Sequence, residues 1–241
     1  MPRPSIRHVD GGAATAARER SGTCGPDVTT RRLAFAVRLR PSRPARRRSV
    51  PDRIPRQLPA IGGVVGPAAF VAAWSILGAR TAGYSPTDDA ISRLAATGAP
   101  THAAMTAGLV AFGTGLPAFG LALRRTMAGP AWALATATGI AALGVAATPL
   151  GSPGRDGVHG AFAAVGYATL AGLPLAAVRP LAAQGRTGWA RWSTLAGAAS
   201  AASLAATLLG PRHGLFQRVG LTIGDAWVVA TALGILRHDQ P

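Results

Sequence analysis

Lysine is absent from the 241-residue sequence, cysteine occurs once, and charged and aromatic residues make up only 14% and 5% of it. A single cysteine, Cys24, excludes a disulfide within the chain and any metal site built from several thiolates. A soluble domain carries about 25% charged residues, so the low charge disfavours a soluble globule. No Walker, Rossmann or GxSxG pattern occurs, which leaves nucleotide-driven chemistry and a serine-hydrolase elbow without support.

The basic residues, all of them arginine, are concentrated at the start of the chain. Fourteen of the 25 basic residues and four of the nine acidic ones precede residue 59, and the formal net charge of the chain is +16. Clusters such as Arg31-Arg32 and Arg46-Arg47-Arg48 alternate with prolines, and no apolar run is long enough to pack. This composition predicts a disordered basic tail over residues 1–58.

Several roles can be weighed for this tail. A cleaved targeting signal needs an apolar region of about 7 to 15 residues, and the stretch after Arg31-Arg32 is too short. The arginine clusters lack an aromatic platform or recognition helix, so we predict no nucleic-acid partner. Two interpretations remain: an anchor on anionic lipid headgroups, and an extension upstream of a misassigned start codon.

From residue 59 onward the sequence consists of long apolar blocks bounded by arginine, proline or glycine. A helix needs roughly 20 residues to cross about 30 Å of hydrocarbon. A soluble bundle would show a charged stripe on each helix, whereas here whole turns lack a polar face. We therefore predict an all-α integral membrane domain over residues 59–241, a helical bundle of six transmembrane helices over 60–79, 101–123, 129–149, 158–178, 192–209 and 219–236.

The arginines near the span ends predict the orientation, because lysine and arginine favour the cytoplasmic side. One side carries Arg53 and Arg56 of the tail and then Arg124, Arg125, Arg179, Arg186, Arg191 and Arg237. The other side carries Arg80, Arg93, Arg155, Arg212 and Arg218, so the tail decides the count. We predict a multi-pass protein of the cell membrane with both termini cytoplasmic.

The first outer loop, residues 80–100, is predicted to contain a short helix. Ser85 is a good N-cap, and Asp88, three residues later, suits a capping box. Asp89 and Arg93 are spaced as an i,i+4 ion pair. The opposite face carries Ile91, Leu94 and Ala95. Such a helix should lie along the outer interface with its apolar face down.

The same loop carries a family resemblance. Its run Ser85–Pro100, SPTDDAISRLAATGAP, resembles the signature of the bacterial membrane family called domain of unknown function 998 (DUF998). His159 at the start of the fourth span, and Gly214–Arg218 with Trp227 further along the sixth, are similar to the pattern of that family. The resemblance covers roughly residues 60 to 237 and omits the tail. It implies a small polytopic inner-membrane protein without an assigned activity, and it supplies no catalytic residue.

Nearly all ionisable groups of the membrane domain fall on the predicted outer side. They form a candidate outer-face polar cluster of Asp88, Asp89, Ser92, Arg93, Arg155, Asp156, His159, His213 and Arg218. With an aspartate, the weak metal candidates His102, His159 and His213 could bind zinc and activate a water. No HxxxH or HExxH pair fixes two ligands on one helix, and an interfacial histidine more often anchors by hydrogen bonding, so we predict no cofactor.

Asp225 is the one charged residue inside a predicted span, about nine residues from its outer end and roughly 13 Å deep. A carboxylate at that depth costs at least ~2.5 kcal/mol unless it is neutralised or paired. Two interpretations stay open. Asp225 is a proton or cation site, or it is a structural acid that is protonated or paired with Arg218, two turns away on roughly the same face.

The function that these features favour is non-enzymatic: membrane organisation, envelope stress or lipid-associated sensing, with the lipid bilayer as the partner. Two alternatives need specific geometry. A metal-dependent hydrolase at the outer interface requires the outer histidines and aspartates to converge within a few ångströms. A small proton-coupled transporter requires a polar pathway that reaches Asp225 from both sides.

Overall fold

The computed structural model describes residues 58–238, and its regular structure is helical throughout. The predicted all-α class is therefore confirmed for these residues, whereas the predicted tail lies outside them apart from Leu58. The helices are α1 (Leu58–Arg80), α2 (His102–Thr126), α3 (Ala131–Ala147), α4 (Asp156–Ala183), α5 (Thr187–Ala206) and α6 (His213–His238), with a short 3₁₀ helix, η1 (Ile91–Ala95), between α1 and α2.

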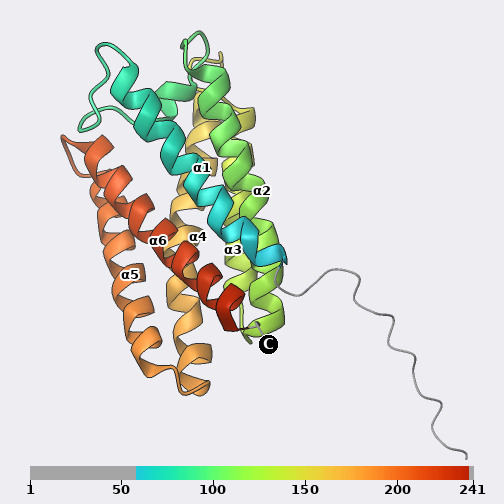
Figure 1. Ribbon diagram of the computed structural model, residues 1–241. Coiled ribbons are helices and arrows are strands. Elements are labelled where there is room, and N and C mark those ends of the chain that lie inside the picture. Colours follow the sequence, from blue (N-terminus) through green and yellow to red (C-terminus); the bar gives the residue numbers. More distant parts are fainter. Residues whose placement is uncertain (1–57, 239–241) are drawn as a thin grey trace, which may run out of the picture. The chain divides into compact units, whose positions relative to one another are not determined.

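The helices run alternately up and down, and each packs against the next along the chain (Figure 1). α6 closes the bundle by packing against α1 and α4 as well as α5. One end carries η1 and the loops 81–101, 148–155 and 207–212, and we call it the η1 end. The other end carries the start of α1, the end of α6 and the connections 127–130 and 184–186, and we call it the terminal end.

The lengths of the helices bear on how many of them cross a membrane. Four of the described helices, α1, α2, α4 and α6, are long and apolar enough to do so. α3 is apolar but has only 17 residues, so it is shorter than the predicted span 129–149. α5 starts at Thr187 rather than 192, so the helix extends the predicted span by five residues that include Trp189 and Arg191. Six helices are thus present in the described residues, and the crossing of the membrane by all six stays a prediction.

Glycines bring α1 and α2 into close contact along what we call the closed seam. A Cβ on Gly62 would lie 2.5 Å from the carbonyl oxygen of Gly115, and a Cβ on Gly115 would lie 2.5 Å from that of Gly62. Gly66, one turn along α1, would place a Cβ 3.2 Å from the carbonyl oxygen of Ala111. Small residues at these positions let the two backbones touch, as is common between helices in membranes.

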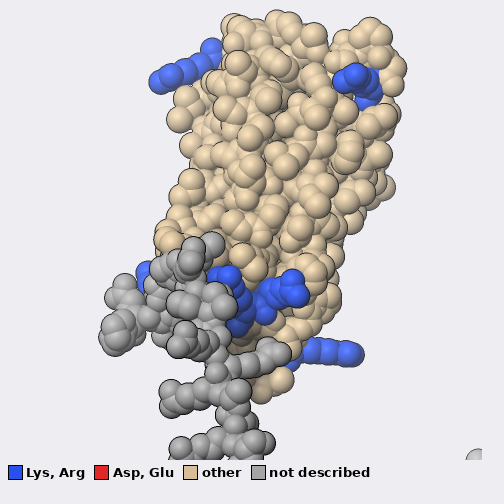
Figure 2. Space-filling view, turned by 90° about the vertical axis from the view of Figure 1, so that its right-hand side faces the viewer, with Lys and Arg blue, Asp and Glu red and all other residues tan. Residues whose placement is uncertain are grey.

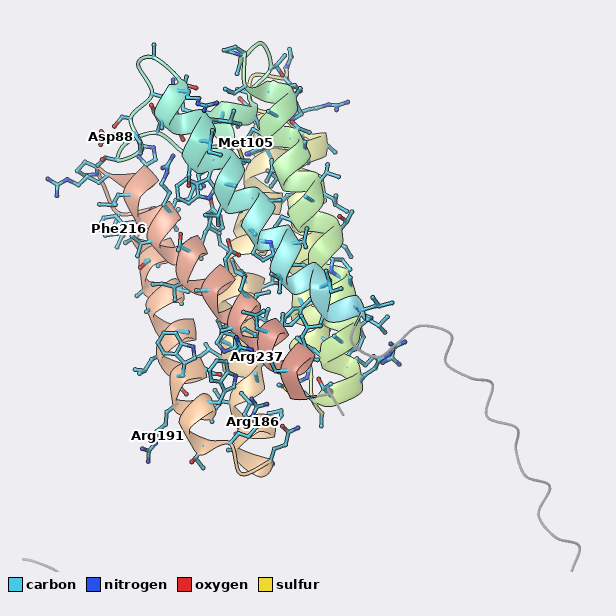
Figure 3. All side chains as sticks on the ribbon, in the orientation of Figure 1. Asp88, Met105, Arg186, Arg191, Phe216 and Arg237 are labelled. Atoms are coloured by element: carbon cyan, nitrogen blue, oxygen red, sulfur yellow. The ribbon has the colours of Figure 1, made fainter. Side chains whose placement is uncertain are left out.

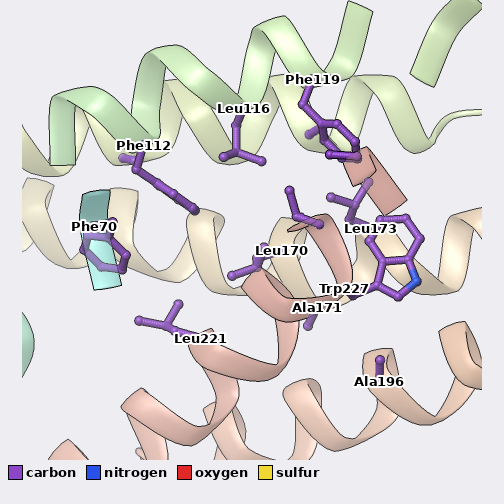
Figure 4. Packing of buried hydrophobic residues seen from close by; sticks show 14 of the residues in the cluster. Phe70, Phe112, Leu116, Phe119, Leu170, Ala171, Leu173, Ala196, Leu221 and Trp227 are labelled. Carbon is purple, nitrogen blue, oxygen red and sulfur yellow. The ribbon is translucent and has the colours of Figure 1, made fainter. Parts of the chain in front are cut away.

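Large apolar side chains fill the space between α2, α4 and α6. Phe112, Leu116 and Phe119 recur at every third or fourth residue of α2 and lie opposite α4 and α6 (Figure 4). Trp227 of α6 is fully buried, and its indole N–H donates a hydrogen bond of 2.8 Å to the Ser193 hydroxyl on α5. The polar tip of this large residue is therefore satisfied inside an apolar interior.

The outer surface of the bundle is apolar between its two ends. Ile140 and Leu195, in the middle of α3 and α5, are 57% and 64% exposed. On the face shown in Figure 2, the arginines lie at the two ends and an uncharged band separates them. Figure 3 places Arg186, Arg191 and Arg237 together at the terminal end. An uncharged band with charged rims is the surface expected of a multi-pass membrane protein.

The loop before α2 differs from its prediction. Ser85 does contact Asp88, accepting its backbone N–H at 3.3 Å, and Asp89 pairs with Arg93 at 2.5 Å. No α-helix follows, because Ala90 is extended, with φ −64° and ψ 146°, and the five-residue η1 begins after it. The apolar side chains of η1 are buried against α1, α2 and α6. The predicted short helix is therefore present as the 3₁₀ helix η1, whose apolar face packs on the bundle, and its position at a membrane interface stays a prediction.

Candidate functional site

The two stretches that carried the family resemblance, 85–100 and 214–218, meet at the η1 end through Arg218. Its Nη1 donates hydrogen bonds to the carbonyl oxygens of Pro86, at 2.6 Å, and Asp89, at 2.9 Å. The same atom also donates to Gly214 O in the preceding turn, at 2.8 Å. Nη2 donates to the hydroxyl of Tyr84. One side chain of α6 therefore holds the whole turn between Tyr84 and Asp89.

Arg218 is a buried cation without a carboxylate partner. Its side chain is 7% exposed, and the one ion pair within residues 58–238 joins Asp89 to Arg93 instead. The guanidinium carbon lies 5.5 Å from the ring centroid of Trp74 and 5.4 Å from that of Tyr84. Carbonyl dipoles and aromatic faces therefore compensate the charge.

Tyr84 is the partner of Arg218 that can itself titrate. Burial raises the pKa of the Tyr84 phenol above its usual value, while the charge and hydrogen bond of Arg218 act in the opposite direction. The Tyr84 hydroxyl also donates to the carbonyl oxygen of Ala90 at 3.2 Å. The neutral phenol is thus the form that fits this contact, since only it can donate.

Gly214 and Leu215 complete the contact between the loop and α6. The Leu215 N–H donates to the carbonyl oxygen of Thr87 at 2.9 Å. A Cβ on Gly214 would lie 2.4 Å from the carbonyl oxygen of Asp89, so a side chain at this position would push the loop away. Glycine is therefore the residue that lets the loop backbone rest directly on the start of α6.

Gln217 bridges the loop to α4. Its Oε1 accepts a hydrogen bond of 2.8 Å from the backbone N–H of Ile91, the first residue of η1. Its Nε2 donates to the hydroxyl of Tyr167 on α4. A buried amide with both ends engaged is rigid, so the start of η1 and the Tyr167 hydroxyl are fixed relative to one another.

A cavity of about 70 Å³ lies beneath η1, between α2, α3, α4 and α6. Most of its wall is apolar and includes Phe70, Phe112 and Phe162. Polar groups are contributed by Ser92, Thr138, His159, Tyr167 and Gln217. A mainly apolar cavity with a few convergent polar groups is the usual form of a small-molecule site.

A second hollow, which we call the groove, runs between α4 and α5 and has a volume of about 450 Å³. Its wall consists mostly of small residues, among them Gly160, Ala164, Ala168, Gly172, Ala201 and Ala205. Leu208, at its rim, is 85% exposed. The groove and the cavity share Ala163 and Tyr167, so these two residues separate them.

The three predicted metal candidates lie apart. Nδ1 of His102 is 2.7 Å from the carbonyl oxygen of Ala95, and Nδ1 of His159 is 2.7 Å from that of Thr148. His213 is exposed at the start of α6. Among residues 58–238, no three His, Cys, Asp or Glu side chains are grouped so that they could hold a metal ion. His102 and His159 thus act as the hydrogen-bonding anchors that interfacial histidines commonly provide.

The other members of the predicted polar cluster have local roles or none. Asp88 and Asp89 accept hydrogen bonds from Ser85, and Asp156 accepts one of 3.1 Å from the N–H of Gly151. Arg155 is exposed. Of the nine predicted residues, Ser92 and His159 line the cavity, and Arg218 holds the loop above it. Tyr84, Trp74 and Tyr167 were missed, because their partners lie far away in the sequence.

Asp225 is buried without a partner. It is 3% exposed, and neither carboxylate oxygen has a hydrogen-bond partner. The donors of Arg218 go to the loop, so the predicted Arg218–Asp225 pair does not form. Of the structural interpretations of this residue, the protonated acid is the one that fits, because a lone buried carboxylate is strongly disfavoured.

Comparison with known proteins identifies one family. The model of a family described as "Protein of unknown function (DUF998)" matches residues 64–234. Neither a curated protein nor a solved structure matches the chain.

Proposed function

The chain belongs to the DUF998 family of proteins of unknown function, and for this multi-pass membrane protein we propose a role in lipid-associated sensing. In this proposal an acyl chain of a bilayer lipid occupies the groove between α4 and α5. Its presence is transmitted through Tyr167 and Gln217 to η1 and the loop above it. Recognition of a lipid, with no bond made or broken in the groove, is the proposed activity.

The position of Tyr167 carries this proposal. Its side chain lines both the groove and the cavity, and its hydroxyl is bonded to Gln217, which in turn holds the Ile91 N–H. A molecule in the groove therefore touches a residue that is two hydrogen bonds away from the loop. Any shift of Tyr167 must be accommodated by Gln217, because both ends of its amide are engaged.

An acyl chain is the occupant that the groove favours. Most of its lining residues are glycine and alanine, and two of its leucines, Leu175 and Leu208, are exposed. In a bilayer this surface faces hydrocarbon, where an empty groove is filled by lipid. A narrow wall of small residues accepts a flexible chain better than a bulky ring, because contact along the whole chain maximises dispersion attraction.

Photocrosslinking tests the groove. The protein is reconstituted in nanodiscs with a phospholipid that carries a photoactivatable diazirine on its acyl chain. We expect crosslinks concentrated on α4 and α5, and Ala201→Phe, which fills the groove, should reduce them several-fold. Ala199→Phe is the matched control, because Ala199 is exposed on the same helix and does not line the groove. Even crosslinking of all helices would contradict the proposal.

Hydrogen exchange tests the transmission step. Tyr167→Phe removes the hydroxyl bonded to Gln217 and leaves the groove wall in place. We expect lipid crosslinking to persist while the amide of Ile91 exchanges faster, because Gln217 is then held at one end only. In the wild type, filling the groove should change exchange at Ile91. An unchanged amide would refute sensing through this route.

The topology is also part of the proposal. Six helices cross the inner membrane, both termini are cytoplasmic, and the η1 end faces outward, because the arginines at and beyond the helix ends favour the terminal end once the tail is counted. The same tail can bind anionic headgroups at the cytoplasmic surface. A membrane-impermeant maleimide should leave Cys24 unlabelled in intact cells and label it after permeabilisation. Labelling of sealed cells would reverse the orientation.

A further inference from the structure

We propose that the cavity beneath η1 is an acyl-transfer site in which Ser92 is the nucleophile and His159 the general base, acting on the ester of a lipid whose acyl chain lies in the groove. This inference rests on the proposed lipid binding and adds chemistry to it. It is carried by four side chains, Ser92, His159, Tyr167 and Gln217, that line one cavity and come from three different elements.

His159 is held in the state that a general base requires. Its Nδ1 lies 2.7 Å from the carbonyl oxygen of Thr148. Since a carbonyl oxygen can only accept, Nδ1 carries a proton, so the neutral imidazole has its lone pair on Nε2. His159 is 5% exposed and lines the cavity, so the residue is sheltered from bulk water. A backbone carbonyl here does the orienting that a carboxylate does in other base-assisted nucleophiles.

Ser92 is presented to the same cavity by a rigid element. The preceding residue, Ile91, has its N–H fixed by Gln217 and is 3% exposed. Leu94, two residues later, is also buried in the core. Ser92 therefore sits between two anchored residues of η1, and it lines the same cavity as His159. A nucleophile and its base must share such a space before their hydrogen bond tightens around a substrate.

Tyr167 supplies a donor for the charge that develops during the reaction. Its hydroxyl oxygen accepts a hydrogen bond from Nε2 of Gln217, which leaves its own proton free to be donated. Because Gln217 is anchored by Ile91, this donor is held in place before any substrate arrives. Preorganised donors at a developing oxyanion are worth about 10²- to 10³-fold in rate.

The substrate class follows from the two hollows. The cavity is small, about 70 Å³, and holds the reacting groups, whereas the groove of about 450 Å³ is apolar and shares Ala163 and Tyr167 with it. A carboxylic ester of a long-chain fatty acid matches this division, with the chain in the groove and the carbonyl beside Tyr167. The side chains that line the cavity include no Asp, Glu, Lys or Arg, which favours a neutral carbonyl over a charged group at the reacting position.

The reaction balances with water as the second reactant. The Ser92 Oγ attacks the ester carbonyl carbon, and its proton passes to Nε2 of His159. The bond from the carbonyl carbon to the alcohol oxygen then breaks, and His159 returns the proton to the leaving alcohol. Water attacks the resulting acyl-serine with His159 again as base, which releases the fatty acid and restores Ser92.

A long-chain alkyl fluorophosphonate, which reacts with serine hydroxyls activated by a base, tests this assignment in nanodisc-reconstituted protein. We expect a phosphonyl adduct on the peptide that contains Ser92 and none on Ser92→Ala. His159→Gln should slow the labelling by roughly 10²-fold or more. His102→Gln is the matched control, because His102 makes the same kind of Nδ1 contact but does not line the cavity, and its labelling rate should equal that of the wild type.

The outcomes separate the two proposals. Wild-type protein that crosslinks lipid in the groove but forms no adduct at Ser92 would overturn the acyl-transfer site and leave lipid sensing intact. Equal labelling of the wild type and His159→Gln, with both variants melting alike, would overturn the role of His159. Wild-type protein that shows no lipid crosslinks concentrated at the groove would instead refute the proposed function.

Discussion

Two helix pairs with similar small-residue composition pack in opposite ways. α1 and α2 meet backbone to backbone, because Gly62 and Gly115 face one another across the closed seam. α4 and α5 touch where Gly197 meets Leu175, and toward the η1 end they leave the groove between them. Glycine and alanine therefore permit close approach without enforcing it. Closure depends on small residues of both helices meeting at one level.

Substituting a glycine in each region gives the largest expected contrast. Gly115→Leu places a side chain where the carbonyl oxygen of Gly62 lies 2.5 Å from the Cβ position, so the helices must separate. We expect a loss of about 3 kcal/mol or more in detergent melting. Gly160→Leu, where a Cβ meets nothing within 4 Å, should change stability by less than about 1 kcal/mol. Equal losses of stability in the two variants would contradict the difference in packing between the two helix pairs.

Arg218→Gln tests whether the loop contacts at the η1 end and the packing of α1 on α2 at the closed seam are independent of one another. The substitution leaves the carbonyl oxygens of Pro86 and Asp89 without their donor, which costs about 2 kcal/mol. We expect faster hydrogen exchange in residues 84–91 and unchanged exchange in the middle of α1 and α2. Arg212→Gln, at an exposed loop position, is the control and should have no measurable effect. Exchange that rises along α1 as well would show that the two regions are coupled.

Asp225 introduces a polar group into the helix that closes the bundle. It lies seven residues from both Arg218, which stacks on Trp74 of α1, and Ala232, whose Cβ is 2.9 Å from the Cβ position of Gly63. Because neither carboxylate oxygen has a partner, Asp225→Leu leaves no hydrogen-bonding group without its partner. We expect the free energy of unfolding of this variant to be about 1 kcal/mol higher than that of the wild type. A destabilised leucine variant would reveal a hidden partner.

The polar replacement of Asp225 separates structure from function. Asp225→Asn keeps the shape and polarity of the side chain but cannot change charge, so it should insert and melt like wild type. Hydrogen exchange of the Ile91 amide in this variant should still change when lipid fills the groove. If that change disappears while melting is unaltered, Asp225 has a functional role besides its structural one. The transporter alternative would then regain support.

Tyr84 gives a small expected effect that depends on pH. The raised pKa of Tyr84 means that folding favours the neutral phenol. The contribution of this group to the free energy of unfolding is therefore fully present below the usual pKa near 10, and it is lost as the pH rises through the folded-state pKa. Tyr84→Phe removes the hydroxyl and should cost about 1 kcal/mol at neutral pH. Wild-type melting should therefore fall more steeply above pH 10 than that of Tyr84→Phe. Parallel pH profiles would contradict this.

Local sequence signals predicted some of these features and missed others for a physical reason. The Asp89–Arg93 pair, the burial of Asp225 and the ends of α1 and α2 depend on spacing or hydropathy along one segment. The groove, and the contacts of Tyr84 and Tyr167, depend on which helix faces meet. Gln217 binds a residue 126 positions away, and Arg218 one 134 positions away. No periodicity within a segment encodes such partners.

The hydrogen bonds of Arg218 to the turn between Tyr84 and Asp89 have a consequence for which residues of this turn can be substituted. Arg218 holds Pro86 and Asp89 by their carbonyl oxygens, which every amino acid possesses, so at these two positions it recognises the course of the chain and not the side chains. The exposed position Asp88 can therefore be exchanged without loss of a contact to Arg218. A new epitope or binding loop could be grafted there while the helices beneath stay untouched.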